Sequence, residues 1–169
     1  MKKFVEIKPE AFNKSPFQII GKDWMLITAG DAEKANAMTA SWGGLGVMWG
    51  KNVAFIVLRP QRYTKEFIDR LQNFSLTFLD AGYKKQLSYF GGVSGRTEDK
   101  ITKSGLTLNN SEKAPYFEEG NMVIVCKKLY AQPFQPECFT SPELDSEWYP
   151  KKDYHTMYVA EIEKIMVKG

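Results

Sequence analysis

Residues 36–42 combine small side chains, hydroxyl groups, an amide and one indole, which is the composition of a wall against a flat ligand. Small residues let the backbone approach such a ligand, polar groups can bond to its edge, and an indole can cover one face. The stretch lies between two apolar runs. Because an edge strand with an interface tryptophan has the same composition, both interpretations stay open.

Residues 59–64 could bind a phosphate group. Arg59 and Arg62 supply planar guanidinium donors, and Tyr63 precedes Thr64, which is a good N-cap for a short helix. The N-terminus of a helix offers unpaired N–H groups and partial positive charge to an anion. The alternative is a solvated basic turn in which Thr64 is an ordinary cap.

Two further features could contribute to a site. Residues 91–100 are glycine-rich, contain Ser94 and end at Lys100, so they could wrap a ligand or form a simple surface turn. His155 is the single histidine and opens a predicted strand after a proline-rich connection. Its ring could line a pocket there, although an isolated histidine is more often structural.

The elements that would position these residues are mostly strands. Apolar, β-branched and aromatic runs predict strands at 24–29, 53–58, 74–78, 122–126 and 155–166, with 36–42 as the second arm of a hairpin. Short helices are predicted from residue 64 and at 83–90 and 99–103, with 132–152 as a long connection. This order indicates a mainly antiparallel β domain, a barrel with helical insertions.

The composition excludes several classes of protein. With 169 residues, 43% of them hydrophobic, the chain fits a single domain spanning residues 1–169. A scattered net charge of +3 argues against nucleic acid or an anionic membrane as partner. Cys126, Cys138 and one histidine do not have the spacing of a metal site. The sequence shows no signal peptide, no apolar segment of about 20 residues and no glycine-rich nucleotide motif, so a cytoplasmic location is expected.

The segments 36–42, 59–64 and 94–100, followed by His155, resemble the flavin reductase-like family in order and spacing. This family comprises FMN-binding split barrels and includes flavoredoxin. The resemblance spans about residues 20–165. It implies a six-stranded antiparallel split β-barrel of Greek-key character with short helical insertions, working as a homodimer with FMN at the subunit interface.

The resemblance also implies roles for individual residues. The expected FMN-binding residues are Asn36, Thr39, Ala40, Ser41, Trp42, Arg59, Arg62, Tyr63, Thr64, Ser94 and Lys100. Among them, Arg59 and Thr64 belong to the phosphate end. His155 matches a family histidine near the flavin or the nicotinamide and is the candidate catalytic residue. The strand after His155 lacks a glycine that many nicotinamide-using relatives carry near its end, which weakens the case for NAD(P)H more than that for FMN.

The expected function is that of an FMN-dependent oxidoreductase, most simply an NAD(P)H-dependent flavin reductase, with NAD(P)H or a redox protein as electron donor. One alternative is a flavoredoxin-like carrier that passes electrons between proteins through bound FMN without catalysis. Another is a degenerate barrel that has lost flavin. The presence of Asn36, Trp42, Arg59, Thr64 and Lys100 argues against that last alternative.

Overall fold

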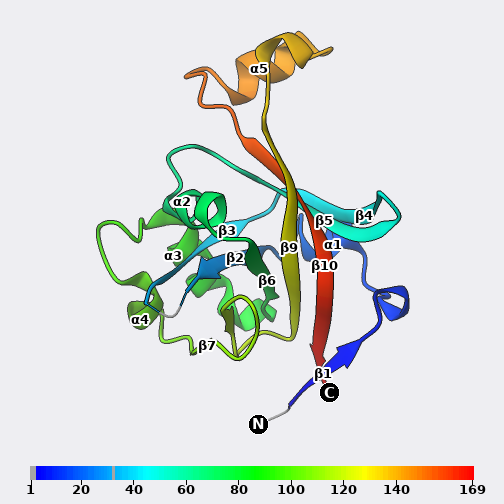
Figure 1. Cartoon of the computed structure of the whole chain (residues 1–169). Helices are drawn as coiled ribbons and strands as arrows, with labels where there is room; N and C mark the ends of the chain where they lie inside the picture. The colour runs from blue at the N-terminus through cyan, green and yellow to red at the C-terminus, as the bar shows by residue number, and fades with distance from the viewer. Residues whose placement is uncertain (1–2, 32) are drawn as a thin grey trace.

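The computed structural model describes residues 3–31 and 33–169, and an antiparallel sheet is its main element (Figure 1). Within these residues, eight strands form the sheet in the order β3-β2-β6-β9-β10-β5-β4, with β1 paired to β10. Their bounds are β1 (Phe4–Ile7), β2 (Met25–Gly30), β3 (Ala35–Ala40), β4 (Gly43–Met48), β5 (Lys51–Leu58), β6 (Asn73–Phe78), β9 (Met122–Pro133) and β10 (Thr156–Lys168). A separate pair joins β7 (Leu108–Asn109) and β8 (Tyr116–Phe117).

The mainly antiparallel β architecture is confirmed, but the expected count of six strands is wrong. Strand β4 contains three glycines, which composition alone assigns to a turn, yet it pairs with β5 along its whole length. The reason lies in Phe55, whose ring lies against Gly44 at a position where any Cβ would collide with it. Strand β1 is a short edge strand on β10, and its four residues alone carry little signal.

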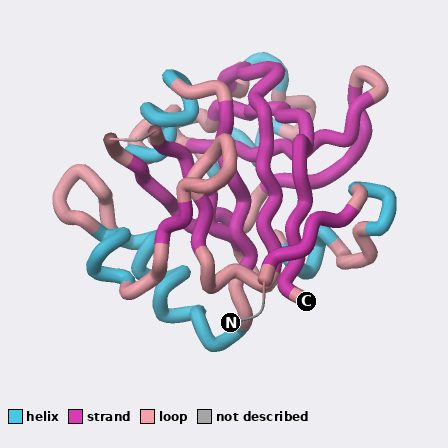
Figure 2. Tube along the Cα trace, turned by 60° about the horizontal axis from the view of Figure 1, so that its bottom comes forward, coloured by secondary structure: helices cyan, strands magenta, loops and turns pink. Residues whose placement is uncertain are grey.

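The sheet curls so that strands far apart in its order share one core. Met38 of β3 and Ile56 of β5 belong to the same cluster of buried side chains, together with residues of β2, β6, β9 and β10. Figure 2 shows the strands side by side, with the helices placed around the margins of the sheet. A continuous apolar interior of this kind holds the strand ends in fixed positions relative to one another.

In the part of the chain that the structure describes, five α-helices accompany the sheet: α1 (Pro16–Ile19), α2 (Tyr63–Arg70), α3 (Lys84–Gly92), α4 (Lys100–Ser104) and α5 (Pro142–Trp148). Helix α2 buries Phe67 and Ile68 in the main core, whereas α3 buries Leu87 and Phe90 in a second cluster. Helix α4 is capped by Asp99 and ends at Gly105, which has a φ of 74°. In the described residues, no helix is long and apolar enough to cross a membrane.

Two local expectations are corrected. Thr64 is not the N-cap of α2, because Arg62 holds that position and the Thr64 hydroxyl accepts a hydrogen bond from the Asn36 amide at 2.8 Å. The segment 132–152 is not only a connection: it continues β9 to Pro133 and contains α5. Figure 1 shows α5 beyond the main body, at the far end of the arm formed by β9 and β10.

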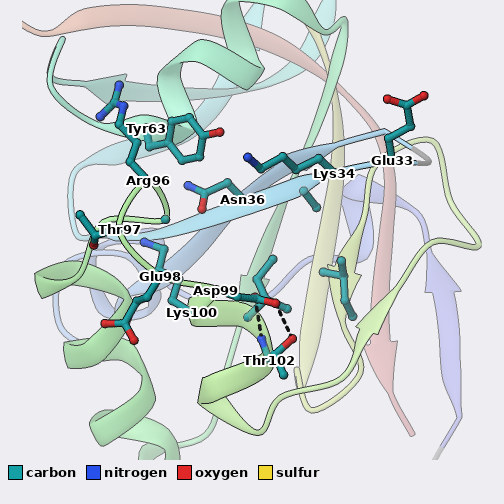
Figure 3. Close-up of a pocket in the computed structure, with 14 residues that line it drawn as sticks. Glu33, Lys34, Asn36, Tyr63, Arg96, Thr97, Glu98, Asp99, Lys100 and Thr102 are labelled. Atoms are coloured by element: carbon teal, nitrogen blue, oxygen red, sulfur yellow. Dashed lines mark hydrogen bonds between the residues drawn. The ribbon is translucent and has the colours of Figure 1, made fainter.

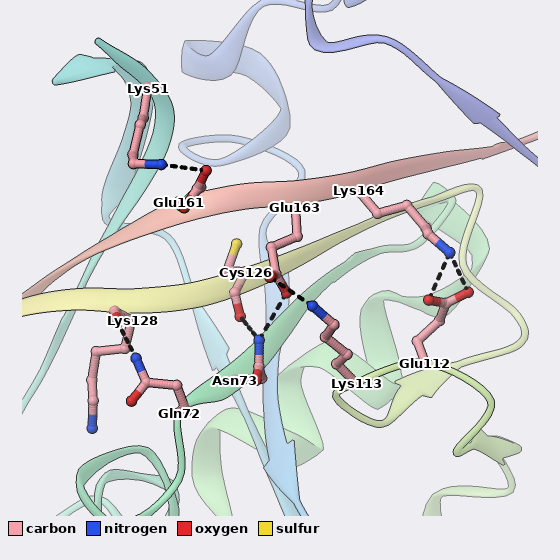
Figure 4. A network of polar contacts seen from close by, with 10 residues as sticks. All are labelled: Lys51, Gln72, Asn73, Glu112, Lys113, Cys126, Lys128, Glu161, Glu163 and Lys164. Atoms are coloured by element: carbon pink, nitrogen blue, oxygen red, sulfur yellow. Dashed lines mark hydrogen bonds and ion pairs between the residues drawn. The ribbon is translucent and has the colours of Figure 1, made fainter. Parts of the chain in front are cut away.

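A polar network fixes β6, β9 and β10 to one another away from that arm (Figure 4). The Asn73 amide donates to the Cys126 carbonyl at 3.1 Å and to the Glu163 carboxylate at 3.0 Å. Lys113 adds an ion pair to Glu163 at 2.8 Å. The pairing of β10 with β9 shifts register between Ile162 and Lys164, so these bonds hold the strands where the regular ladder is interrupted.

Candidate functional site

Two adjoining cavities lie where β3 and β5 end and α2 begins. The first, which we call the tryptophan cavity, has a volume of about 180 Å³, and the second, the lysine cavity, about 210 Å³. Met38, Arg59 and Arg62 line both, so the two cavities form one elongated site. Every candidate residue from the sequence lines at least one of them.

The candidates divide between the two cavities by segment. The candidates that line the tryptophan cavity are Thr39, Ala40, Ser41, Trp42, Arg59, Arg62 and His155. Those that line the lysine cavity are Asn36, Arg59, Arg62, Tyr63, Thr64, Ser94 and Lys100. Asn36, expected at the ring of a flavin, therefore lies with the residues expected at its phosphate.

Aromatic rings enclose the tryptophan cavity. The indole of Trp42 meets that of Trp148 edge to face, with ring centroids 5.0 Å apart, and lies 5.1 Å from the His155 ring. Trp42 and Trp148 are each about two-fifths exposed, so together they form part of the mouth of the cavity. The arrangement presents flat apolar surface beside the small residues at the end of β3.

His155 is buried between this cavity and a group of aromatic side chains from the α5 arm. Its Nδ1 atom lies 2.7 Å from the Tyr149 hydroxyl. Burial and the positive charges of Arg59 and Arg62 lower the pKa of His155 to about 4, with Asp153 acting in the opposite direction. The imidazole is therefore neutral at neutral pH.

Arg59 connects β5 to the α5 arm. Its guanidinium forms an ion pair with Asp153 at 2.8 Å and donates to the Trp148 carbonyl at 2.8 Å. It also lies over the Tyr149 ring at 5.0 Å. Because its charge faces a carboxylate, Arg59 contributes less positive potential to the cavities than its position alone suggests.

Arg62 and Lys100 are the two cations whose charge is not offset in this way. Arg62 donates to the Gly91 carbonyl at 2.7 Å, and burial followed by the nearby charge of Arg59 lowers its pKa. Lys100 is 3% exposed and donates to the carbonyls of Phe90 and Val93 at 3.0 and 2.9 Å. Neither side chain forms an ion pair with a carboxylate of the described residues.

The lowered pKa of Lys100 shows that this environment disfavours the charged form of the amine. Burial, with a further contribution from Arg62, lowers the pKa from 10.5 to about 8. A charged amine without a carboxylate partner is costly to bury, and an anion in the lysine cavity would offset that cost. The chemistry of the donors, two cations with the Ser94 hydroxyl, fits a phosphate group.

Close packing shapes one wall of the lysine cavity. Gly95 lies against the Asn36 side chain, and a Cβ at this position would overlap the Asn36 amide oxygen. It would also come within 3.1 Å of the Tyr63 ring. Asn36 is itself fixed by its bond to Thr64, so a side chain at position 95 cannot be accommodated without moving it.

A third and larger cavity of about 500 Å³ adjoins the lysine cavity and shares Asn36, Tyr63, Gly95 and Lys100 with it (Figure 3). Its other charged lining residues are of both signs: Lys34, Arg96, Glu33, Glu98 and Asp99. Arg96 is held by Glu66 and by the Gln61 carbonyl. The potential of this third cavity is therefore mixed, in contrast to the lysine cavity.

The sequence did not single out Trp148 and Tyr149, which the α5 arm brings to the site. The four prolines of this region predict a connection, although loops of its length are often functional. Two aromatic residues side by side just before the only histidine were the signal that could have pointed to them. Met38 lines both cavities, but in the sequence it is typical of an ordinary core residue.

Comparisons with known proteins agree with this architecture. The chain is similar in structure to a flavoredoxin of Methanosarcina acetivorans, with 24% identity over 85% of this chain and 67% of the other and a TM-score of 0.66. A flavin reductase-like FMN-binding domain of Shewanella baltica is 13% identical over 99% of this chain and 78% of the other, with a TM-score of 0.70. An NADH:FAD oxidoreductase of Streptomyces globisporus is 16% identical over 86% of this chain and 74% of the other, with a TM-score of 0.64. At these identities the likeness shows the fold.

No curated protein matches the sequence. The flavin reductase-like domain, in contrast, matches residues 19–169, which is most of the chain. This match confirms the resemblance drawn from the sequence: the chain belongs to the flavin reductase-like family.

Proposed function

We propose that this protein is an FMN-binding oxidoreductase, most simply an NAD(P)H-dependent flavin reductase. Membership of the family supports a flavin-binding redox function. The observation that carries the finer proposal is the polarity of the elongated site. One end holds two cations, Arg62 and Lys100, that have no carboxylate partner within the described residues, and the other is walled by indoles and small residues.

In this proposal the FMN phosphate lies in the lysine cavity. Arg62, Lys100 and the Ser94 hydroxyl would bind it, while Asn36 and Thr64 hold the wall behind it. The dianionic phosphate would favour the charged form of Lys100 and raise its pKa. Lys100 lines the same cavity as the residues proposed for the phosphate, which supports a role in binding the anion rather than in tuning the ring.

In the same proposal, the isoalloxazine ring would lie in the tryptophan cavity. Thr39, Ala40 and Ser41 would approach its edge, and Trp42 would cover part of a face. When bound, the flavin supplies the capacity to accept and pass on a hydride. The chain would orient the ring, exclude water from it through Trp42 and Trp148, and hold the neutral His155 beside it.

The charges around the third cavity favour FMN over FAD. A second phosphate and an adenosine would have to extend from the lysine cavity toward Glu33, Glu98 and Asp99. Three carboxylates there repel a pyrophosphate, and of the two cations that only this cavity contains, Lys34 and Arg96, the second is already engaged by Glu66. We therefore expect FMN to bind more tightly than FAD.

A carrier function is the second candidate. Trp42 and Trp148 are both partly exposed at the mouth of the tryptophan cavity, where a redox protein could approach the ring. The similarity in fold to a flavoredoxin is compatible with this function. In either function the electron donor is NAD(P)H or a redox protein.

The proposal includes a homodimer. An outer apolar face is formed by Met48 of β4, Phe55 of β5 and Tyr130 of β9, which the strand register places on one side of the sheet, with Trp49 in the turn between β4 and β5. Trp49 and Tyr130 pack together with ring centroids 6.2 Å apart. Aromatic residues and methionine are enriched at protein interfaces, so a second copy of this chain is the partner we propose for this face.

The experiment is a titration of flavin-free protein with FMN and with FAD, followed by NADH and NADPH oxidation with excess free FMN. Saturable FMN binding and turnover of many equivalents support the reductase. Binding of FMN with reduction of only one equivalent favours the carrier. A folded protein that binds neither flavin contradicts the proposal.

A further inference from the structure

The Tyr149–His155 contact determines which nitrogen of the histidine can act in the site. The Tyr149 hydroxyl and His155 Nδ1 are 2.7 Å apart, and both residues are buried, at 3% and 8% exposure. For a neutral imidazole two arrangements fit this distance: the tyrosine donates to Nδ1, or Nδ1–H donates to the tyrosine. The two arrangements leave opposite hydrogen-bonding character at Nε2.

The surroundings of Tyr149 select the first arrangement. If Nδ1–H donated, the tyrosine proton would need another acceptor, and no other hydrogen bond of this hydroxyl is found in the described residues. A buried O–H without an acceptor is costly, whereas donation to Nδ1 satisfies it.

Packing prevents Tyr149 from turning away to find another partner. The Arg59 guanidinium lies 5.0 Å from the centroid of its ring, and the centroid of the Tyr154 ring is also 5.0 Å away. Phe134 and Phe139 contact it from the arm, with centroids at 6.5 and 5.8 Å. Four neighbours thus hold the hydroxyl at the histidine.

We propose that Tyr149 is a positioning residue that fixes His155 as the Nε2–H tautomer, so that the imidazole presents a neutral hydrogen-bond donor to the tryptophan cavity. Its target is an acceptor atom of the flavin ring or of the molecule that exchanges a hydride with it. This role rests on the proposed function, whereas the tautomer itself does not. His155 would accordingly neither accept a proton at Nε2 nor carry charge in the reaction.

The charged groups that face His155 agree with a neutral ring. Arg59 at the end of β5 and Arg62 at the start of α2 disfavour the imidazolium, and burial acts in the same direction. Asp153, in the loop before β10, favours it but is itself paired with Arg59. Protonation of Nδ1 would also break the bond from Tyr149.

Nitrogen NMR of the flavin-free protein tests the inference, because His155 is the only histidine and gives the only imidazole signals. We expect an unprotonated Nδ1 and a protonated Nε2 that persist from about pH 5 to 8, where a free histidine titrates. A protonated Nδ1 with a bare Nε2, or an imidazolium at neutral pH, overturns it.

Two variants assign the effect to Tyr149. Tyr149→Phe removes the hydroxyl with little change of shape, and we expect the nitrogen signals to move toward a mixture of tautomers. The matched control is Tyr154→Phe in the same aromatic group, whose hydroxyl bonds to Asp145 instead. Unchanged nitrogen signals in a folded Tyr149→Phe protein overturn the role of Tyr149.

The flavin-loaded protein then separates this inference from the proposed function. With NAD(P)H and FMN, we expect Tyr149→Phe to lower kcat several-fold with little change in the affinity for FMN, and Tyr154→Phe to leave both unchanged. A protein that shows the Nε2–H tautomer but binds no flavin contradicts the proposed function alone. A Tyr149→Phe protein that keeps the wild-type kcat contradicts the role of the donor in the reaction.

Discussion

The Arg59 guanidinium lies 2.8 Å from the Asp153 carboxylate, and this ion pair closes the base of the α5 arm over the tryptophan cavity. Each side chain is about three-quarters buried, so the pair holds Trp148, Tyr149 and His155 close to the end of β5. The same pair removes most of the net charge of Arg59 from the site. The two arginines of residues 59–64 therefore have different roles, although the sequence presents them alike.

Arg62→Gln should weaken FMN binding more than Arg59→Gln. Arg62 has no carboxylate partner in the described residues, so its loss removes a charge-assisted bond to phosphate worth about 1.5–3 kcal/mol, or roughly 10-fold to 150-fold in Kd. The matched Arg59→Gln change should cost less than about 1 kcal/mol in FMN binding, because Asp153 already offsets that charge. Fluorescence titration of both variants measures the difference, and a larger loss for Arg59→Gln would contradict this assignment.

FMN affinity should fall as the pH rises above about 8. The pKa of Lys100 in the ligand-free protein is about 8, since burial and Arg62 lower it. Above that pH the amine is neutral and has to take up a proton before it can pair with phosphate, which adds an unfavourable step to binding. Titrations between pH 7 and 10 should show this decline in the wild type and a flat profile in Lys100→Met. A decline of equal size in both proteins would exclude Lys100 as its source.

The stability of the ligand-free protein should change with pH in the opposite sense. The folded-state pKa of Lys100 is lower than the unfolded value of 10.5, so the unfolded chain binds more protons between pH 8 and 10.5. Relative to Lys100→Met, the free energy of unfolding of the wild type should rise across this interval by about 1–3 kcal/mol. Urea unfolding at a series of pH values measures the difference, and identical pH profiles would show that Lys100 titrates normally.

Only some of the elements and contacts that position these residues could be predicted from the sequence. Residues 53–58 carry an unbroken β-branched and aromatic run, so β5 was predictable, and Arg59 and Arg62 follow at its end. Residues 43–48 were not predictable, because Gly44 of β4 leaves space for the ring of Phe55, a contact that exists only in the folded sheet. The position of Tyr149 beside His155 likewise depends on the ion pair that closes the α5 arm.

The cap of α2 illustrates the same limit within a candidate motif. Threonine before an apolar turn is a good N-cap by local rules, and Thr64 was predicted as one. In the fold the Asn36 amide reaches its hydroxyl from β3, 28 positions away in the sequence, and the cap shifts to Arg62. Local pattern identified the residues of the site, whereas tertiary contacts decided their partners.

Gly95→Ala should damage the site through Asn36. The new Cβ would overlap the Asn36 amide oxygen and press on the Tyr63 ring, so the Asn36–Thr64 bond would break or the loop would move. We expect a loss of about 1–3 kcal/mol in stability, as for overpacking of a close contact, together with weaker FMN binding. Gly82→Ala is the control, since nothing lies within 4 Å of its added Cβ. Thermal unfolding and FMN titration measure both effects, and equal behaviour of the two variants would refute the steric argument.

Charged substitutions on the outer apolar face should separate the proposed dimer. Met48 is 44% exposed and lies on the same side of β4 as Phe55 on β5, so Met48→Lys places a charge within the face with little effect on the monomer fold. An unpaired charge buried between two copies is costly, and we expect a shift from dimer to monomer in size-exclusion chromatography with light scattering. Val5→Lys, at an exposed apolar position on β1, is the control and should leave the mass unchanged. A wild-type protein that is monomeric at high concentration, or a Met48→Lys protein that keeps the dimer mass, would show that this face does not join two copies.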